Sequence, residues 1–104
     1  MPVPPKAIQR MGARALEERQ KYLAASRPLT TVGIARARDL ANGKDLSLQT
    51  LKRMAAFARQ LGNYKPGERD NQGRLTKGTI AVMAWGGPDA IERWAPAQIR
   101  KLEK

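Results

Sequence analysis

Four polar side chains lie along a segment that has the pattern of a short helix, LSLQTLKRMAAFARQL. Apolar residues recur in it at helical spacing, so we expect Gln49, Lys52 and Arg53 on the outer face. Arg59 falls at the margin of that face. Amide and guanidinium side chains can hydrogen-bond base edges, and neighbouring cations can hold phosphates. These residue types therefore favour contact with a nucleic acid or another polyanion.

The preceding residues predict a partner helix whose buried side carries Ile34, Ala37, Leu40 and Ala41. Asn42 and Gly43 are typical of a helix end, and Ser47 is a suitable cap for the next helix. Such a pair is similar to a helix-turn-helix, which places its second helix in the major groove of DNA. Two helices joined by a glycine turn are also a common way to pack a helical protein. The spacing leaves both interpretations open.

A second group of cations falls between Gly62 and Gly78, in the stretch GNYKPGERDNQGRLTKG. Its four glycines and one proline, with almost no apolar side chain, predict a long exposed loop. Lys65, Arg69, Arg74 and Lys77 could wrap a phosphate backbone or another subunit. The spacing matches neither a Walker phosphate loop nor a dinucleotide-binding fingerprint.

The chain contains no cysteine and no histidine. It therefore lacks a thiolate nucleophile, the commonest metal ligand and the usual general base at neutral pH. The acidic residues fit caps or ion-pair partners better than a paired-carboxylate site. We expect no enzymatic activity, no metal and no cofactor.

The formal net charge is +11 in 104 residues. The basic excess is spread over the whole chain, unlike that of a disordered basic tail. Folding should display these cations over much of the surface, where they favour polyanions, although a merely well-solvated surface is the alternative. The start, MPVPPKAIQR, lacks the apolar core of a signal peptide, and no stretch is long enough to cross a bilayer.

The remaining pattern predicts an all-α fold. The first helix should begin at Pro4 or Pro5 and stop near Ser26, and its apolar stripe comprises Ile8, Met11, Ala15, Leu16, Tyr22 and Leu23. The spacing of Arg14 and Glu18, and of Glu17 and Lys21, suits ion pairs across one turn. Thr30 or Thr31 should cap the second helix, and the third should run from Ser47 to about Leu61.

Two further regions complete this arrangement. TIAVMAW predicts a short apolar helix halted by Gly86 and Gly87, while PDAIERWA and PAQIRKLEK each begin like a helix with proline. With so few large side chains available, Trp85 and Trp94 are better core residues than base-stacking platforms. We expect one domain, residues 1–104, that forms a compact bundle of about five short helices.

Two motifs carry a resemblance to a known group of sequences. VGIARARDLANGKDLSLQTLKRMAAFAR, followed by GTIAVMAWGGPDAIERWA, resembles a short module of tailed-bacteriophage and prophage proteins. The shared pattern is RARDLANG, LS, T and KRM, then WGG and a final Trp. The opening PPKAIQRMGARALEERQKY is similar to the lead-in of that module. The resemblance implies a phage setting rather than a mechanism.

We therefore expect a non-catalytic, virion-associated structural protein whose basic surface contacts DNA or acidic head or tail proteins. It would belong to an oligomeric assembly, lie in the virion or the host cytoplasm, and make no membrane contact. The alternative is a free, helix-turn-helix-like DNA-binding or regulatory protein of a phage.

Overall fold

Helices account for most of residues 2–103, the part of the chain that the computed structural model describes. Five are α-helices: α1 (Lys6–Arg19), α2 (Thr31–Ala41), α3 (Leu48–Ala56), α4 (Lys77–Ala84) and α5 (Ala95–Leu102). Two short 3-10 helices, η1 (Ala24–Ser26) and η2 (Phe57–Asn63), and a π-helical turn, η3 (Ala90–Trp94), lie between them. No strand forms in the described residues, and Arg69 and Leu75 make an isolated bridge. The predicted all-helical fold with five helices is confirmed.

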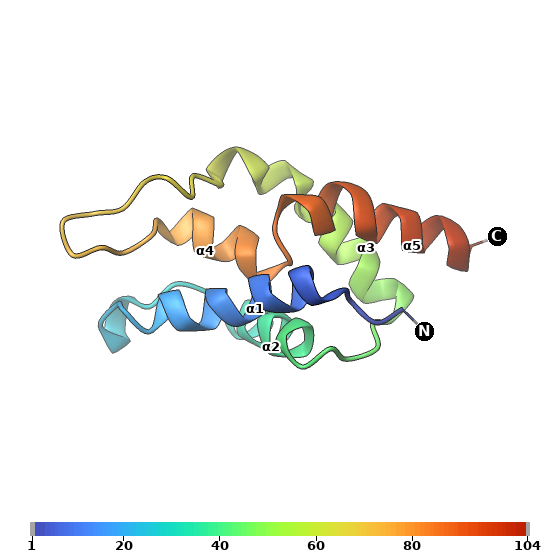
Figure 1. The fold of residues 1–104 in the computed structure, drawn as a ribbon, viewed down its shortest axis with the longest axis horizontal. Helices are drawn as coiled ribbons and strands as arrows, with labels where there is room; N and C mark the ends of the chain where they lie inside the picture. Colours follow the sequence, from blue (N-terminus) through green and yellow to red (C-terminus); the bar gives the residue numbers. More distant parts are fainter. Residues whose placement is uncertain (1, 104) are drawn as a thin grey trace.

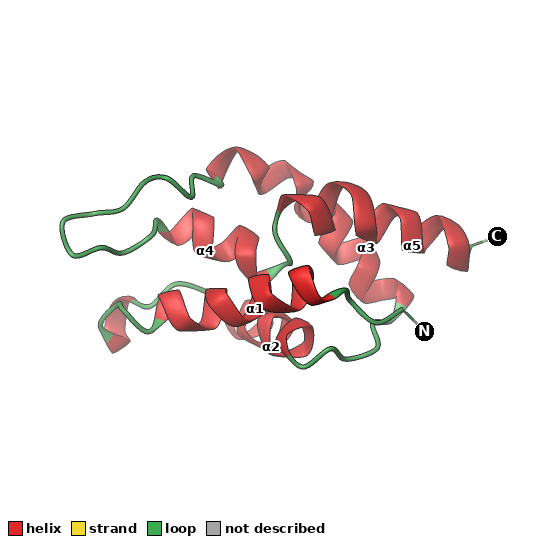
Figure 2. Cartoon of the chain, viewed as in Figure 1, coloured by secondary structure: helices red, strands yellow, loops and turns green. Residues whose placement is uncertain are grey.

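The helices pack in two groups. In one group α1 packs against α2 and α4, and in the other α3 packs against α5 and η3 (Figures 1 and 2). Helix α4 also contacts η2, which joins the two groups. The molecule measures 48 × 24 × 21 Å, and the segment 64–76 lies at the opposite end of its long axis from the end of α5 (Figure 1).

Small residues bring α1 and α2 close together. Ala15 on α1 and Ala37 on α2 are fully buried. A Cβ atom added to Gly12 would lie 2.8 Å from the carbonyl oxygen of Ala37 and 2.9 Å from Cβ of Leu40. The short side chains thus let the two backbones approach, and the core needs few large residues.

The predicted caps form. Thr30 accepts a hydrogen bond from the backbone N–H of Gly33 at the start of α2, and Ser47 accepts one from Thr50 at the start of α3. Asn42 ends α2, and Gly43 follows it with φ of 65°. The bonds to Thr30 and Ser47 satisfy N–H groups that the first turn of each helix leaves without partners.

The first helix ends earlier than predicted, at Arg19 rather than near Ser26. Its last turn tightens, because the N–H groups of Gln20, Lys21 and Tyr22 bond to carbonyls three residues back. The Tyr22 hydroxyl can then donate to the carbonyl oxygen of Leu75, at 2.6 Å. Leu23 lies beyond this turn and is 78% exposed, so its predicted place in the apolar stripe is wrong.

The third helix is α-helical only to Ala56 and continues to Asn63 as a 3-10 helix. At this junction the ring of Phe57 stacks on Trp85, with centroids 5.5 Å apart and planes at 21°. Trp85 is only 9% exposed, which agrees with the core role predicted for it. No helix in residues 2–103 has the length and apolar character needed to span a membrane.

The two predicted C-terminal helices form one continuous run, η3 and α5. The backbone N–H of Ala95 bonds to the carbonyl of Ala90, five residues back, in the turn directly before Pro96. Proline lacks an N–H and clashes with the carbonyl four residues before it in a regular α-helix. The wider π turn accommodates Pro96 without ending the helix.

We predict that Gly12→Ala destabilises the fold by about 1–3 kcal/mol, because the added methyl group overpacks the α1–α2 contact. The measurement is urea unfolding followed by far-UV circular dichroism. Gly62→Ala is the matched control, since nothing lies within 4 Å of a Cβ at Gly62. Equal midpoints for the two variants would contradict the importance of the close α1–α2 approach.

Candidate nucleic-acid interface

The outer face of α3 and η2 carries two arginines without an acidic partner. Arg53 and Arg59 are both exposed, and neither forms an ion pair within residues 2–103. They share a shallow hollow of about 280 Å³, which is also lined by Ala56, Phe57 and Gln60. Gln49 is exposed on the first turn of α3. We call Gln49, Lys52, Arg53 and Arg59 the α3 face.

Lys52 differs from the two arginines because it has a partner inside the chain. Its Nζ lies 2.9 Å from a carboxylate oxygen of Glu103, and both side chains are about half exposed. Exposed ion pairs of this kind are worth about 0–1 kcal/mol. A phosphate could therefore replace Glu103 at little cost, so Lys52 stays a candidate contact residue.

The helices that flank the 42–47 turn pack in different directions. Helix α2 packs on α1 and α4, whereas α3 packs on α5, η3 and η2. Leu46, within the turn, is buried, and its N–H bonds to the carbonyl of Pro2. The α3 face is therefore positioned by α5 and η3 rather than by α2.

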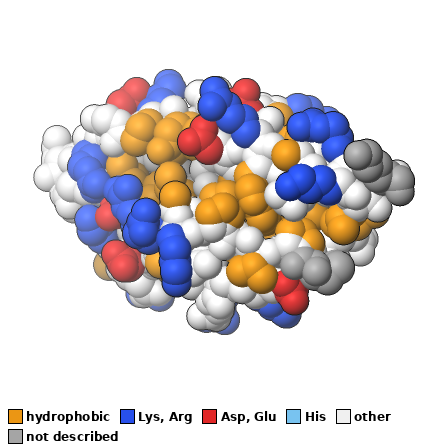
Figure 3. All heavy atoms as spheres, turned by 45° about the vertical axis from the view of Figure 1, so that its right-hand side comes forward, with side chains coloured by type: hydrophobic (Ala, Val, Ile, Leu, Met, Phe, Trp, Pro, Cys, Tyr) orange, Lys and Arg blue, Asp and Glu red, His pale blue; other side chains and the backbone are white. Residues whose placement is uncertain are grey.

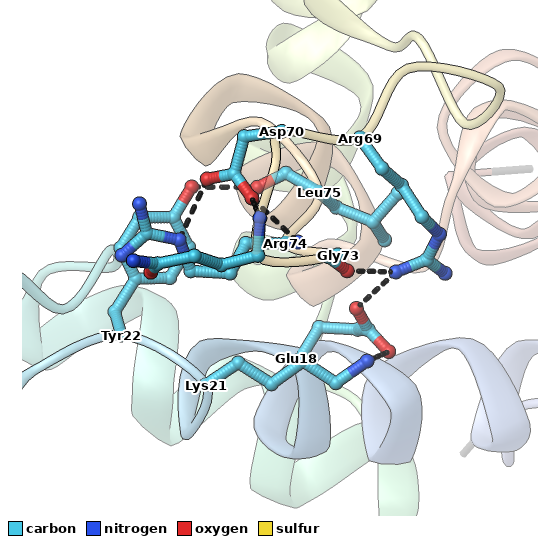
Figure 4. A network of polar contacts seen from close by, with 9 residues as sticks. Glu18, Lys21, Tyr22, Arg69, Asp70, Gly73, Arg74 and Leu75 are labelled. Carbon is cyan, nitrogen blue, oxygen red and sulfur yellow. Dashed lines mark hydrogen bonds and ion pairs between the residues drawn. The ribbon is translucent and has the colours of Figure 1, made fainter.

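The three cations of the segment 64–76, and Lys77 at the start of α4, all have partners inside the chain. Arg69 donates to Glu18 at 3.1 Å and to the carbonyl of Gly73 at 2.6 Å (Figure 4). Arg74 lies 2.6 Å from Asp70 and stacks over the ring of Tyr22 at 4.6 Å. Lys77 lies 5.6 Å from the same ring, and Lys65 is 4.0 Å from Glu68. The contacts of Arg69 with Glu18 and of Arg74 with Tyr22 hold the segment 64–76 against α1 and the turn that follows it.

The tip of this segment is closed by hydrogen bonds of its own. Asp70 accepts bonds from the backbone N–H groups of Gln72 and Arg74 and from the Arg74 side chain (Figure 4). The Tyr22 hydroxyl then joins the segment to the end of α1 through the Leu75 carbonyl. In this arrangement Arg69 and Arg74 hold the segment 64–76 in place.

The ion pairs predicted along α1 are wrong. Glu18 is only 8% exposed and pairs with Lys21 and Arg69, each at 3.1 Å, instead of with Arg14. Lys21 is engaged there, so the predicted pair of Glu17 with Lys21 does not form. The reason is tertiary, since Glu18 lies on the buried side of α1 beside the returning 64–76 segment.

The structure also exposes three basic residues that were not among the predicted contact residues. Lys6, Arg10 and Arg14 are exposed and have no acidic partner among residues 2–103. Their spacing of four residues places them on one face of α1. This spacing is visible in the sequence and could have predicted a basic face. Figure 3 shows basic side chains gathered on both sides of a band of exposed hydrophobic atoms.

Two carboxyl groups of the anchor have shifted pKa values. Burial by itself would raise the pKa of Glu18, but hydrogen bonds and charge from Lys21 and Arg69 outweigh it, and the pKa lies below its ordinary value of 4.5. The backbone N–H of Arg74 is the largest cause that holds the pKa of Asp70 below 3.8, helped by the Arg74 side chain and the Gln72 N–H. In both cases the surrounding hydrogen bonds stabilise the charged carboxylate, which is the form that pairs with the arginines.

Comparison of the chain with protein-family models, with curated proteins and with solved structures gives no match. Within residues 2–103, no three acidic, histidine or cysteine side chains converge as metal ligands would.

We predict that the anchor weakens in acid. Because the folded-state pKa of Glu18 is lowered, its contribution is complete above about pH 4.5 and is lost as the pH falls through the lowered pKa. Glu18→Gln should lower the stability at pH 7 by roughly 1–3 kcal/mol. It should also reduce the difference between urea-unfolding free energies measured at neutral and acidic pH.

Glu17→Gln is the control, because Glu17 is exposed on the same helix and has no cationic partner in the described residues. That variant should keep both the stability and its pH dependence. An unchanged pH dependence in Glu18→Gln would show that this carboxylate does not secure the loop.

Proposed function

We propose that this protein is a non-catalytic structural component of a bacteriophage particle and that it binds the phosphate backbone of DNA through the α3 face. The observation that carries the proposal is the pair of exposed arginines, Arg53 and Arg59, that flank one hollow without an acidic neighbour. Guanidinium groups suit this contact, since their planar donors match phosphate oxygens.

The charge balance supports a polyanion as the partner. Five acidic residues make ion pairs in the structure: Glu18, Asp39, Glu68, Asp70 and Glu103. At a formal net charge of +11, many cations still lack a partner. Their mutual repulsion costs stability, which a polyanion relieves while releasing its own counterions.

Contact with the backbone is favoured over reading of bases. In a helix-turn-helix the first helix supports the second as it enters the major groove. Here α2 packs on α1 and α4, while α3 packs on α5 and η3. A free helix-turn-helix-like regulator is therefore the second candidate, and the exposed amide of Gln49 on α3 is the feature that favours it.

In this proposal the glycine-rich loop has a structural role and does not form the main DNA contact. Arg69 and Arg74 are engaged within the chain, so phosphate contact there would have to displace existing partners. Lys65 and Lys77 have weaker partners, an exposed carboxylate 4.0 Å away and an aromatic ring. The α3 face offers arginines that need no such exchange. We therefore assign DNA contact to the α3 face and anchoring to the loop.

The phage particle is proposed from the resemblance of the RARDLANG and WGG motifs to a tailed-phage module. A domain with so thin a core also gains stability when neighbours in an assembly bind its folded state. An acidic head or tail protein is the other partner that the same surface suits. Mass spectrometry of purified particles tests the setting, and a fixed copy number per particle is the expected result.

We predict that Arg53→Ala combined with Arg59→Ala weakens DNA binding at low salt. The slope of log K against log salt should become shallower by about 2, because two phosphate contacts disappear. The measurement is a titration of a fluorescent duplex at several salt concentrations. Far-UV circular dichroism should be unchanged, since both side chains are exposed.

Glu103→Gln is a control that acts in the opposite direction. It removes the partner of Lys52, so affinity for DNA should rise. Binding unchanged in both variants would contradict DNA contact at the α3 face. Binding of an acidic virion protein in place of DNA would assign the surface to that protein.

A further inference from the structure

A second basic surface runs along α1, which we call the α1 stripe: Lys6, Arg10 and Arg14. Each residue is four positions from the next, so the charges are about 6 Å apart along the helix and cover roughly 12 Å. One strand of duplex DNA carries a phosphate for about every 3.4 Å of axis. The α1 stripe is thus long enough to contact several phosphates.

Arg14 is free to belong to the α1 stripe because Glu18 pairs with other residues. The local spacing would let Glu18 neutralise Arg14, but its two oxygens accept from Lys21 and Arg69. Glu17 is the acidic residue on the outer side of α1 beyond Arg14, and it marks the end of the α1 stripe. Asp89 lines a separate hollow beside Ala7 and Met11 and makes no ion pair with the α1 stripe.

The α1 stripe and the α3 face belong to different helix groups. The buried side of α1, with Ile8, Gly12 and Ala15, packs towards α2 and α4. The buried side of α3, with Leu51 and Met54, packs towards α5 and η3. Lys6, Arg10 and Arg14 are exposed, and so are Arg53 and Arg59, so each basic surface lies outside the buried side of its own group.

We infer that one molecule holds two DNA segments at once, one on the α1 stripe and one on the α3 face, and so bridges them. This inference rests on the proposed DNA binding and adds a second site to it. Phosphates bound at both the α1 stripe and the α3 face also neutralise more of the net charge of +11 than phosphates bound at one of them. The ligand of the α1 stripe is the phosphate backbone of a duplex.

The test is a capture assay at low ionic strength. One duplex is fixed to beads, a second carries a fluorophore, and the wild-type protein should join them. Lys6→Gln with Arg10→Gln and Arg14→Gln should lower capture on the order of tenfold or more, because one set of contacts is lost. The same variant should still bind a single duplex through the α3 face.

Arg53→Gln with Arg59→Gln should also lose capture, and the weaker binding of one duplex that remains should run through the α1 stripe. The charge-matched control is Arg38→Gln with Arg93→Gln and Lys101→Gln, which removes three exposed cations from α2, η3 and α5. This control should keep capture close to wild type. Glutamine is a good helix former, so all three variants should keep their helix content.

The outcomes separate this inference from the proposed function. A wild-type protein that binds no duplex at low salt overturns both. A wild-type protein that binds one duplex but captures no second one overturns the bridging alone. Capture that survives in the α1 variant, or that falls equally in the charge-matched control, also overturns it, because net charge rather than the α1 stripe would then be responsible.

Discussion

The buried carboxylate of Glu18 decides how the charges of this protein are divided. It accepts one hydrogen bond from Lys21 on its own helix and one from Arg69 on a segment 51 residues away. A buried carboxylate needs such partners, because an unpaired charge at this place would cost several kcal/mol. Its two bonds secure the 64–76 segment to α1, and they leave Arg14 without the partner that the local spacing offers.

Close packing of small residues sets the rest of the architecture. Gly12, Ala15 and Ala37 bring α1 and α2 together, so the helices bury their inner faces with few large side chains. The second group is closed around Leu51 and Met54, and the rings of Phe57 and Trp85 stack where η2 meets the end of α4. Because the apolar side chains lie in the core, the outer faces of α1 and α3 can carry cations.

Surface charge in this protein falls into two kinds. Cations such as Arg69 and Arg74 contact carboxylates and the ring of Tyr22, and they stabilise the fold. Arg53, Arg59 and the α1 stripe face solvent without such partners. Net charge alone does not distinguish the two kinds, although the difference decides which residues are available to a phosphate.

Local chemistry explains what could be predicted from the sequence. Helix type and number follow from periodicity, and the caps at Thr30 and Ser47 follow from hydrogen bonds that span three residues. The exposure of Gln49 and Arg53 likewise follows from the apolar side of one helix. Each of these features depends on neighbours within about one turn.

Contacts between distant residues decided the rest. The tightened turn after Arg19 brings the Tyr22 hydroxyl to the carbonyl of Leu75, a contact between residues 53 positions apart. The pairing of Glu18 with Arg69, and with it the free side chain of Arg14, required the two segments to meet in space. The sequence by itself determined which residues are charged and helical, because these are local properties. Only the tertiary structure decided which charges neutralise one another, because ion pairing depends on distance and burial rather than on position along the chain.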